Sequence, residues 1–187
     1  LHTKVISTGA DLYVNPNGSD SNDGLTTAHP LKTIAMALSR MAVNPDTNRT
    51  IHLANGIYSK NTNGEKFPLN LRSYVDIIGE NEGSTIFDGD SSTYFLKGNE
   101  EIRKYSFKNL TLKNGYGMAI LEQGILDASG AIVLVRNYYS LFENITILNT
   151  SAVFSGCIML GSCNQITLKS VDAYHTTGGY GTIRIGN

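Results

Sequence analysis

The oxygen-rich loop at residues 15–24 is the first part of this sequence whose side chains point to a particular chemistry. It places the carboxylates of Asp20 and Asp23 on either side of the amide of Asn22. Hard cations such as Ca²⁺ take roughly six to eight oxygen ligands, so Asp20, Asn22 and Asp23 are a candidate calcium site. The spacing is not that of an EF-hand loop, and the same residue types also form Asx turns that only hold a loop in place. Both interpretations stay open at this point.

Aromatic residues in the later turns are candidates for contact with sugars. A tyrosine ring has an apolar face and a polar tip, and this combination suits stacking on a sugar ring. The candidate carbohydrate contacts are Tyr138, Tyr139, Tyr174, His175 and Tyr180. Packing inside the turns is the alternative role for the same side chains.

A polysaccharide lyase would need a different set of residues. In a calcium-dependent lyase the cation binds the carboxylate of a uronate and makes its C5 proton more acidic, and a Lys or Arg removes that proton. This chemistry requires clustered acids beside an outward basic residue. The outward or turn-facing candidates in the later part of the chain are Arg136, Lys169, Asp172, His175 and Arg184. Asp172 is the only acid among them, so we assign no catalytic residues.

Composition excludes several classes of protein. The 187 residues are 41% hydrophobic and 17% charged, with a formal net charge of −1. These values argue against a disordered chain and against a polybasic nucleic-acid binder. No apolar run approaches the ~20 residues of a membrane-spanning helix. The 19 glycines and 18 asparagines indicate many tight turns.

One amphipathic helix is expected near the N-terminus. Apolar residues recur with helical spacing across Pro30–Ala42, and Pro45 follows the end of this stretch. Pro30 suits the first helical position, and His29 then falls at the N-cap. Since the helix has a single apolar stripe, we expect it to lie against the rest of the fold as a cap.

After Thr50 the sequence consists of short apolar strands separated by Gly, Asn, Asp and Ser. No stretch between them has helical periodicity, so the choice is between an antiparallel sandwich and a coil of parallel strands. The expected strands are Ile51–Leu53, Val75–Ile78, Thr85–Phe87, Tyr94–Leu96, Phe107–Leu112, Ala131–Val135, Phe142–Leu148, Cys157–Leu160, Gln165–Leu168 and Thr182–Ile185.

Two families of internal repeats favour the parallel coil. In the first family the segments are 26 and 25 residues apart: Ala131–Leu134, Cys157–Leu160 and Thr182–Ile185. In the second family they are 35 and 21 residues apart: Asn109–Leu112, Asn144–Ile147 and Gln165–Leu168. Two strand families that alternate along the chain predict coils in which each turn adds one strand to each of several parallel sheets.

Alternation within the strands assigns their faces. Ile132, Ile158 and Ile183 are expected to stack on one another inside the coil. The residues that follow them should face outward: Val133, Met159 and Arg184. A polar column is expected where the second family of strands ends, because the same offset leads to Asn114, Asn149 and Ser170. Stacked amide side chains can hydrogen-bond from coil to coil.

The two cysteines are expected to be free thiols. Cys157 opens a strand and Cys163 lies just past its end. Across an extended strand they would be about 20 Å apart, which is too far for a disulfide without a sharp bend.

Several segments resemble a known family: Tyr13–Asp20, Asn22–Gly24, Pro30–Ile34, Ala37–Leu38, Ile51–Tyr58, Phe67–Leu69 and Val75–Gly79. They are similar to the N-terminal part of pectate-lyase-like, right-handed parallel β-helix proteins, which include secreted β-helix proteins of unassigned activity. Family-nine pectate lyases begin in a similar way. The resemblance covers residues 11–90 well and the rest only through the pattern of coils. The pair of aspartates that binds calcium in the family-nine enzymes has no counterpart here.

The resemblance and the repeats together give one expectation for the whole chain. The fold class is all-β, a right-handed parallel β-helix with an amphipathic capping helix. Residues 1–50 form the N-terminal loop and cap, and residues 51–187 form coils that continue in further coils or domains of the same polypeptide. The resemblance implies an extracellular or cell-surface location and a polysaccharide partner.

Three functions fit this expectation. The first is a non-catalytic scaffold or carbohydrate-contact module of a secreted or cell-surface protein. The second is a calcium-dependent polysaccharide lyase of the pectate or uronate type, whose catalytic coils lie partly beyond residue 187. The third is an adhesin-like surface that binds another protein.

Overall fold

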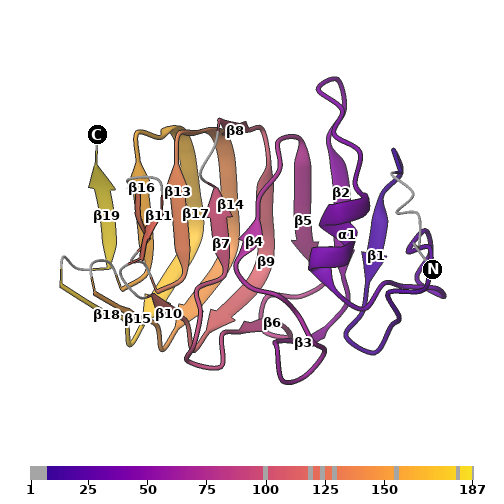
Figure 1. Ribbon diagram of the computed structural model, residues 1–187, viewed down its shortest axis with the longest axis horizontal. Helices are drawn as coiled ribbons and strands as arrows, with labels where there is room; N and C mark the ends of the chain where they lie inside the picture. The colour runs from indigo at the N-terminus through magenta and orange to yellow at the C-terminus, as the bar shows by residue number, and fades with distance from the viewer. Residues whose placement is uncertain are drawn as a thin grey trace.

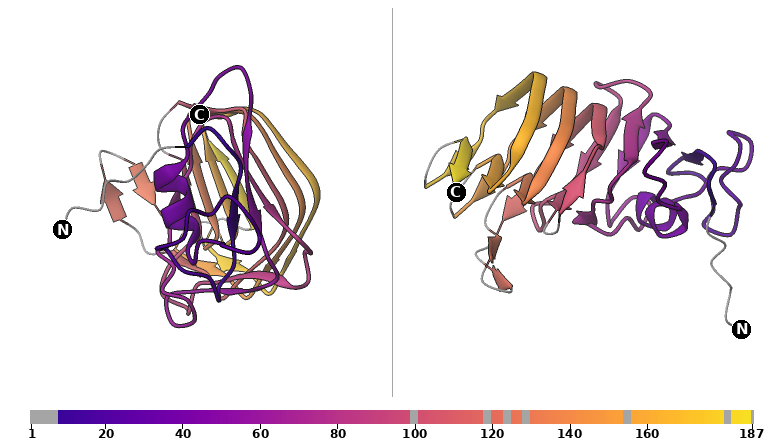
Figure 2. Two further views of the ribbon diagram at one scale, coloured as in Figure 1. Left: turned by 90° about the vertical axis from the view of Figure 1, so that its right-hand side faces the viewer. Right: turned by 90° about the horizontal axis from the view of Figure 1, so that it is seen from above.

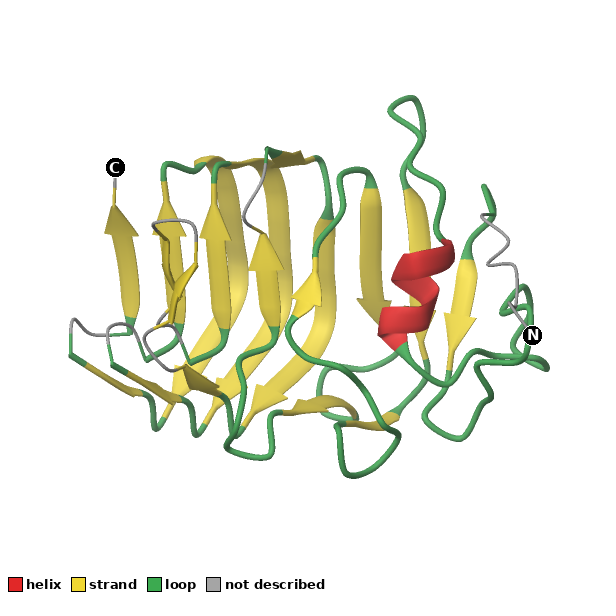
Figure 3. Cartoon of the chain, in the orientation of Figure 1, coloured by secondary structure: helices red, strands yellow, loops and turns green. Residues whose placement is uncertain are grey.

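The computed structural model describes residues 8–98, 101–117, 120–122, 125–127, 130–153, 156–179 and 182–186. Within these residues the protein is mostly β, with one short helix (Figure 1, Figure 3). The strands lie across a long axis, and seen along that axis they form a closed outline around one interior (Figure 2). No helix in the described ranges has the length and hydrophobicity needed to cross a bilayer.

The strands belong to four sheets. The nine-stranded main sheet contains β1 (Leu12–Val14), β2 (Arg49–Leu53), β3 (Gly56–Tyr58), β5 (Val75–Gly79), β6 (Thr85–Asp88), β8 (Ile102–Arg103), β9 (Ser106–Lys113), β14 (Asn137–Leu148) and β17 (Asn164–Tyr174). The five-stranded sheet contains β4 (Leu69–Asn70), β7 (Leu96–Gly98), β13 (Ile132–Val135), β16 (Ile158–Gly161) and β19 (Ile183–Gly186). A three-stranded sheet contains β10 (Tyr116–Gly117), β15 (Ser151–Ala152) and β18 (Thr177–Gly178), and β11 (Ile120–Glu122) forms a hairpin with β12 (Ile125–Asp127).

The expected parallel pairing is present. Among the described strands every pair is parallel except the β11–β12 hairpin. Ile132 of β13 pairs with Ile158 of β16, and Ile158 pairs with Ile183 of β19. Ile132 and Ile158 are almost completely buried, whereas Ile183 and Ile185 on the last strand are 45% and 77% exposed. The first family of repeats is therefore confirmed as one ladder of stacked residues.

The register expected for the second family is wrong in its last member. Ile166 pairs with Ser140, whereas the residue that pairs with Ile145 is Val171. The error arises because β14 and β17 each run through a bend and carry an apolar stretch on both sides of it. The Ile-Thr-Leu sequence at the start of β17 resembles the later half of β14 but lies beside its first half.

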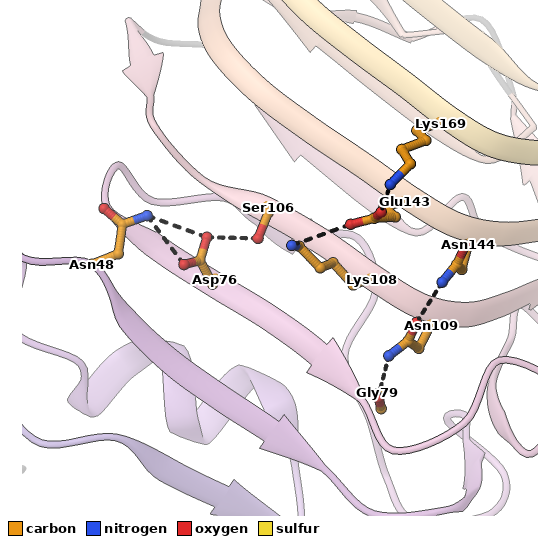
Figure 4. A network of polar contacts seen from close by, with 9 residues as sticks. All are labelled: Asn48, Asp76, Gly79, Ser106, Lys108, Asn109, Glu143, Asn144 and Lys169. Atoms are coloured by element: carbon orange, nitrogen blue, oxygen red, sulfur yellow. Dashed lines mark hydrogen bonds and ion pairs between the residues drawn. The ribbon is translucent and has the colours of Figure 1, made fainter.

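The bend of the main sheet is a column of residues with left-handed backbone. Asn109, Asn144 and Ser170 have φ values of 58°, 54° and 50° and follow residues that pair with one another. Nδ2 of Asn144 donates to Oδ1 of Asn109 at 3.1 Å, and Nδ2 of Asn109 donates to the carbonyl of Gly79 at 3.2 Å (Figure 4). Gly79 must be glycine, since a Cβ there would lie 2.1 Å from the carbonyl oxygen of Asn109.

The prediction of a polar column at Asn114, Asn149 and Ser170 is therefore wrong for Ser170. Asn114 and Asn149 do have left-handed backbone at corresponding positions, and the third residue of that column is His175. Ser170 belongs to the bend column instead. The position was counted from Gln165–Leu168, which lies beside the first half of β14, so the same register error moved the expected residue from His175 to Ser170.

Val133 does not face solvent as alternation suggested. Its exposed fraction is 0%, whereas Met159 is half-buried and Arg184 is exposed. The β11–β12 hairpin projects from the side of the coil that carries the five-stranded sheet (Figure 2). Alternation gives the direction in which a side chain points, but it does not show whether another segment covers that direction.

The prediction that both cysteines are free thiols is confirmed, since no disulfide joins Cys157 and Cys163. Cys157 is buried and Cys163 is half-buried. Burial raises the pKa of the Cys157 thiol to about 12, so this side chain packs in the core as a neutral group.

Helix α1 (Ile34–Arg40) begins later than the sequence suggested. Thr33 is the N-cap and accepts a hydrogen bond from the backbone N–H of Met36, so neither His29 nor Pro30 starts the helix. Leu31 is held in a parallel bridge with Val14, which keeps the preceding segment extended. The helix lies on the same side of the coil as the five-stranded sheet, next to β4 (Figures 1 and 2).

Both ends of α1 are held by side chains from the following coil. The carboxylate of Glu65, which is 2% exposed, accepts hydrogen bonds from Ile34 N at 2.7 Å and Ala35 N at 3.1 Å. At the other end the guanidinium of Arg72 donates to the carbonyls of Leu38 and Met41. These contacts satisfy helix-terminal groups that have no partner within a helix, and they match the helix dipole in sign.

Replacing Asn144 tests the bend column. Asn144→Ala removes the side-chain hydrogen bond to Asn109 and leaves an alanine in left-handed backbone. We therefore expect a loss of about 2 kcal/mol in the free energy of unfolding. Asn144→Gly loses the same bond but adopts positive φ readily and should lose clearly less. Urea denaturation followed by circular dichroism measures both. Equal losses in the two variants would show that the backbone conformation carries no cost.

Glu65 gives a second test of stability. Glu65→Ala leaves the N–H groups of Ile34 and Ala35 without their acceptor and should cost about 2 kcal/mol, while Glu65→Gln keeps an acceptor and should cost less. Burial raises the pKa of Glu65, so the folded state holds its proton more tightly than the unfolded state. Its contribution therefore weakens as pH rises from the ordinary Glu pKa through the raised value. Unfolding curves against pH should lose this slope in the Gln variant.

Candidate functional site

The outer face of the main sheet is the candidate functional site. Because the strands are parallel and in register, side chains from six strands form one row across this face. Proceeding from β1 to β17, the row consists of Tyr13, His52, Ile78, Lys108, Glu143 and Lys169. The apolar neighbours of this row on the first five strands are buried, among them Leu12, Ile51, Ile77, Phe107 and Phe142, so the row follows from the same alternation that builds the interior.

A carboxylate lies between two amines in the later half of the row. Glu143 forms ion pairs with Lys108, at 3.3 Å from Nζ to Oε2, and with Lys169 through Oε1 (Figure 4). The amines of Lys169 and Lys108 hold the pKa of Glu143 below its ordinary value, so this carboxylate is ionised at neutral pH. Of these three residues, the sequence drew attention only to Lys169, because nothing local marks Lys108 and Glu143 as neighbours.

A second polar cluster lies beside this row. Oδ1 of Asp76 accepts from the Ser106 hydroxyl at 2.8 Å, and Oδ2 accepts from Nδ2 of Asn48 at 3.1 Å (Figure 4). The amide of Asn48 also donates to the carbonyl of Lys104 at 3.0 Å. The carboxylate is therefore oriented by two neutral donors.

An aromatic pair lies at the N-terminal end of the row. The rings of Tyr13 and His52 stack with centroids 5.0 Å apart and an interplanar angle of 18°. Nε2 of His52 lies 3.5 Å from Oδ2 of Asp11. Neither aromatic was singled out as a sugar contact from the sequence, although His52 lies at the centre of the expected strand Ile51–Leu53.

A cavity of about 280 Å³ opens beside this pair, close to the lower limit for small-molecule sites. Its lining residues are Tyr13, Val14, Asn15, Thr27, Pro30, His52, Leu53, Ala54, Ile78, Gly79 and Glu80. The Glu80 carboxylate is held through Oε2, which accepts from the backbone N–H of Asn55 at 3.1 Å. The cavity thus combines aromatic and aliphatic walls with one carboxylate, and none of its lining residues is Lys or Arg.

The oxygen-rich loop binds the rest of the protein through hydrogen bonds. Oδ1 of Asp20 accepts from Lys32 N and Thr33 N, and Oδ2 accepts from the Thr33 hydroxyl. Asn22 donates to the carbonyl of Pro30, and Asp23 accepts from Leu25 N in an Asx turn. Within the described residues no three acidic, His or Cys side chains are grouped as metal ligands. The calcium site stays a prediction.

The structure separates the aromatic residues that the sequence suggested as sugar contacts. Tyr138 and Tyr139 belong to the start of β14 rather than to a turn, and Tyr174 and His175 lie at the end of β17. Since β14 and β17 pair in parallel, these two pairs lie at opposite ends of the strands. Tyr139 and Tyr174 are 57% and 54% exposed, and Tyr138 packs under the guanidinium of Arg103. Tyr180 lies outside the described residues.

Comparison with known proteins places the chain in a family. The family model described as "Protein of unknown function (DUF1565)" matches residues 16–168. A curated relative, the metabotropic glutamate receptor-like protein P of Dictyostelium discoideum, is 30% identical over 142 residues, which are 75% of this chain and 9% of the relative. This chain therefore spans less than a tenth of that protein.

Two solved structures match this chain. Pectin methylesterase PemA from Erwinia chrysanthemi matches with a TM-score of 0.51 and 15% identity, over 89% of this chain and 56% of the esterase. A rhamnogalacturonan lyase matches with a TM-score of 0.47 and 13% identity, over 95% of this chain and 62% of the lyase. At this level of identity, the likeness to the esterase shows a shared fold and does not extend to its reaction.

The ion pairs of Glu143 lead to a prediction about salt. Glu143→Gln removes the carboxylate and leaves Lys108 and Lys169 facing each other, so the variant should unfold at a lower temperature than the wild type. The difference should shrink as salt is raised from about 0.01 M to about 1 M, because the Debye length falls roughly tenfold over that range. Thermal unfolding at several salt concentrations measures this. A difference that does not depend on salt would mean that Glu143 acts through packing.

Proposed function

This chain belongs to the DUF1565 family and has the fold of the pectate-lyase-like parallel β-helix superfamily, and from this premise we propose that it is a non-catalytic carbohydrate-contact module. The module would be part of a secreted or cell-surface protein. The contact surface is the outer face of the main sheet, from Tyr13 and His52 on the first strands to Lys169 on β17.

The observation that carries this proposal is the aromatic pair at the end of a polar row. The stacked rings of Tyr13 and His52 offer apolar surface for the C–H groups of a sugar. Asp76, Glu143 and Lys108 then offer acceptors and donors for hydroxyl groups along the same face. The parallel strands set a regular spacing between these groups, and a regular spacing suits a polymer of repeating units.

The ion pairs formed by the lysines on this face support a non-catalytic role. Lys108 and Lys169 are both paired with Glu143, so neither amine is free to act as a base. Asp88 is likewise paired with Lys113, at 3.2 Å. The esterase that shares the fold is named for pectin, and we extend to this chain the polysaccharide as a class of ligand and not the reaction.

The finer features of the fold complete this proposal. The coils would wind in the right-handed sense, residues 1–50 would form the capping segment with α1, and residues 51–187 the coils. Tyr138, Tyr139, Tyr174, His175 and Tyr180 would make further contacts at the ends of the strands. Asp20, Asn22 and Asp23 would bind Ca²⁺.

Measurements of sugar binding and of lyase activity together test the proposal. The purified chain should bind at least one oligosaccharide of a cell-wall panel in calorimetry, and Tyr13→Ala should weaken that binding roughly tenfold or more through lost aromatic contact. Tyr116→Ala, at an exposed tyrosine on the separate strand β10, is the matched control and should bind as the wild type does.

Activity is followed in the same samples. With polygalacturonate, alginate and added Ca²⁺, we expect no rise in ultraviolet absorbance from unsaturated products. Such a rise would replace the proposal with the lyase alternative. Failure to bind any member of the panel would overturn it and favour an adhesin-like surface.

A further inference from the structure

The cavity beside Tyr13 and His52 carries an inference about the chemical class of the ligand, and this inference rests on the proposed function. Sugars of polysaccharides differ in charge: some are neutral, uronates are anionic, and amino sugars carry a protonated amine. We propose that the cavity binds an amino sugar, with the Glu80 carboxylate receiving its ammonium group and the rings of Tyr13 and His52 covering the sugar ring.

The first argument is the free acceptor on Glu80. Oε2 accepts from Asn55 N at 3.1 Å, which fixes the carboxylate at the wall of the cavity. Among the described residues no donor reaches Oε1, and the side chain is exposed. An oriented carboxylate with one free oxygen is suited to a charge-assisted hydrogen bond from an amine.

The second argument is the charge around the cavity. Its eleven lining residues include Glu80 but no Lys or Arg. His52 is the remaining titratable base in the lining, and Asp11 faces it at 3.5 Å. A ligand that brings positive charge would therefore find an unmatched carboxylate, whereas a uronate would meet a like charge.

The third argument is the position of the available cations. Lys108 and Lys169 on the same row are paired with Glu143, on later strands than those that line the cavity. Neither lysine lines the cavity, and both amines are engaged by Glu143. The cavity discriminates by charge while the aromatic and aliphatic walls supply contact that any pyranose can use.

Two oligosaccharides of equal length separate these contributions. A glucosamine hexasaccharide and an N-acetylglucosamine hexasaccharide differ in the charge and the acetylation of the amine. In mildly acidic buffer that protonates the amine, calorimetry should show roughly 2- to 5-fold tighter binding of the glucosamine form, the range expected for an ion pair with an exposed carboxylate. A galacturonate hexasaccharide should bind more weakly than either.

Variants assign the effect to the cavity. Glu80→Gln keeps the size of the side chain and should remove the preference for the amine, with a smaller effect on the binding of N-acetylglucosamine. Tyr13→Ala should weaken both ligands. Glu82→Gln is the matched control, because this nearby acid accepts from the Thr146 hydroxyl and does not line the cavity. Thermal unfolding of each variant shows that the fold is retained.

The outcomes separate this inference from the proposed function. In one outcome, neutral oligosaccharides bind and Tyr13→Ala lowers their affinity, but Glu80→Gln leaves the affinity for the glucosamine hexasaccharide unchanged. The amino-sugar inference is then overturned, and the proposed carbohydrate-contact function stands. Preferential binding of the galacturonate hexasaccharide overturns it in the same way. If no oligosaccharide of any charge binds, the proposed function fails and the inference fails with it.

Discussion

The register between successive parallel strands is the constraint on which the rest of this structure depends. Each paired strand residue lies over its partner in the coil before it, so one choice of register fixes both the apolar stack inside and the polar row outside. Ile132 over Ile158 and Lys108 beside Glu143 are two results of the same rule. A shift by one residue would send core side chains to the solvent and dissolve the candidate site at the same time.

The sequence was informative where a pattern repeats and much less so where the chain bends. Alternation and spacing were enough to place Ile132, Ile158 and Ile183 in one ladder, because each coil repeats the same apolar pattern there. They failed in β17, where two apolar stretches flank a left-handed residue and only pairing distinguishes them. The start of α1 was also misplaced, since Glu65, which satisfies its first N–H groups, lies about thirty residues away along the chain.

The candidate site shows the same limit more sharply. Its aromatic pair joins β1 to β2, and its ion pairs join β9, β14 and β17, so every contact crosses from one coil to another. Tyr13 and Lys108 have nothing unusual in their local sequence, whereas Tyr138 and Tyr139 are conspicuous as a pair and lie at the start of β14, away from the row. Composition can suggest the kind of ligand, but the surface that meets it is assembled by stacking.

The coils also differ in length without losing alignment. Leu110 and Ile145 pair although 35 residues separate them, and Ile145 and Val171 pair across 26 residues, with the β11–β12 hairpin in the longer interval. The additional residues are thus accommodated between β10 and β13, and the pairing of the flanking strands stays in register. The segment between β10 and β13 is therefore a position where a loop can be inserted, lengthened or exchanged. A foreign epitope could be inserted there by design while the parallel sheets keep their shape.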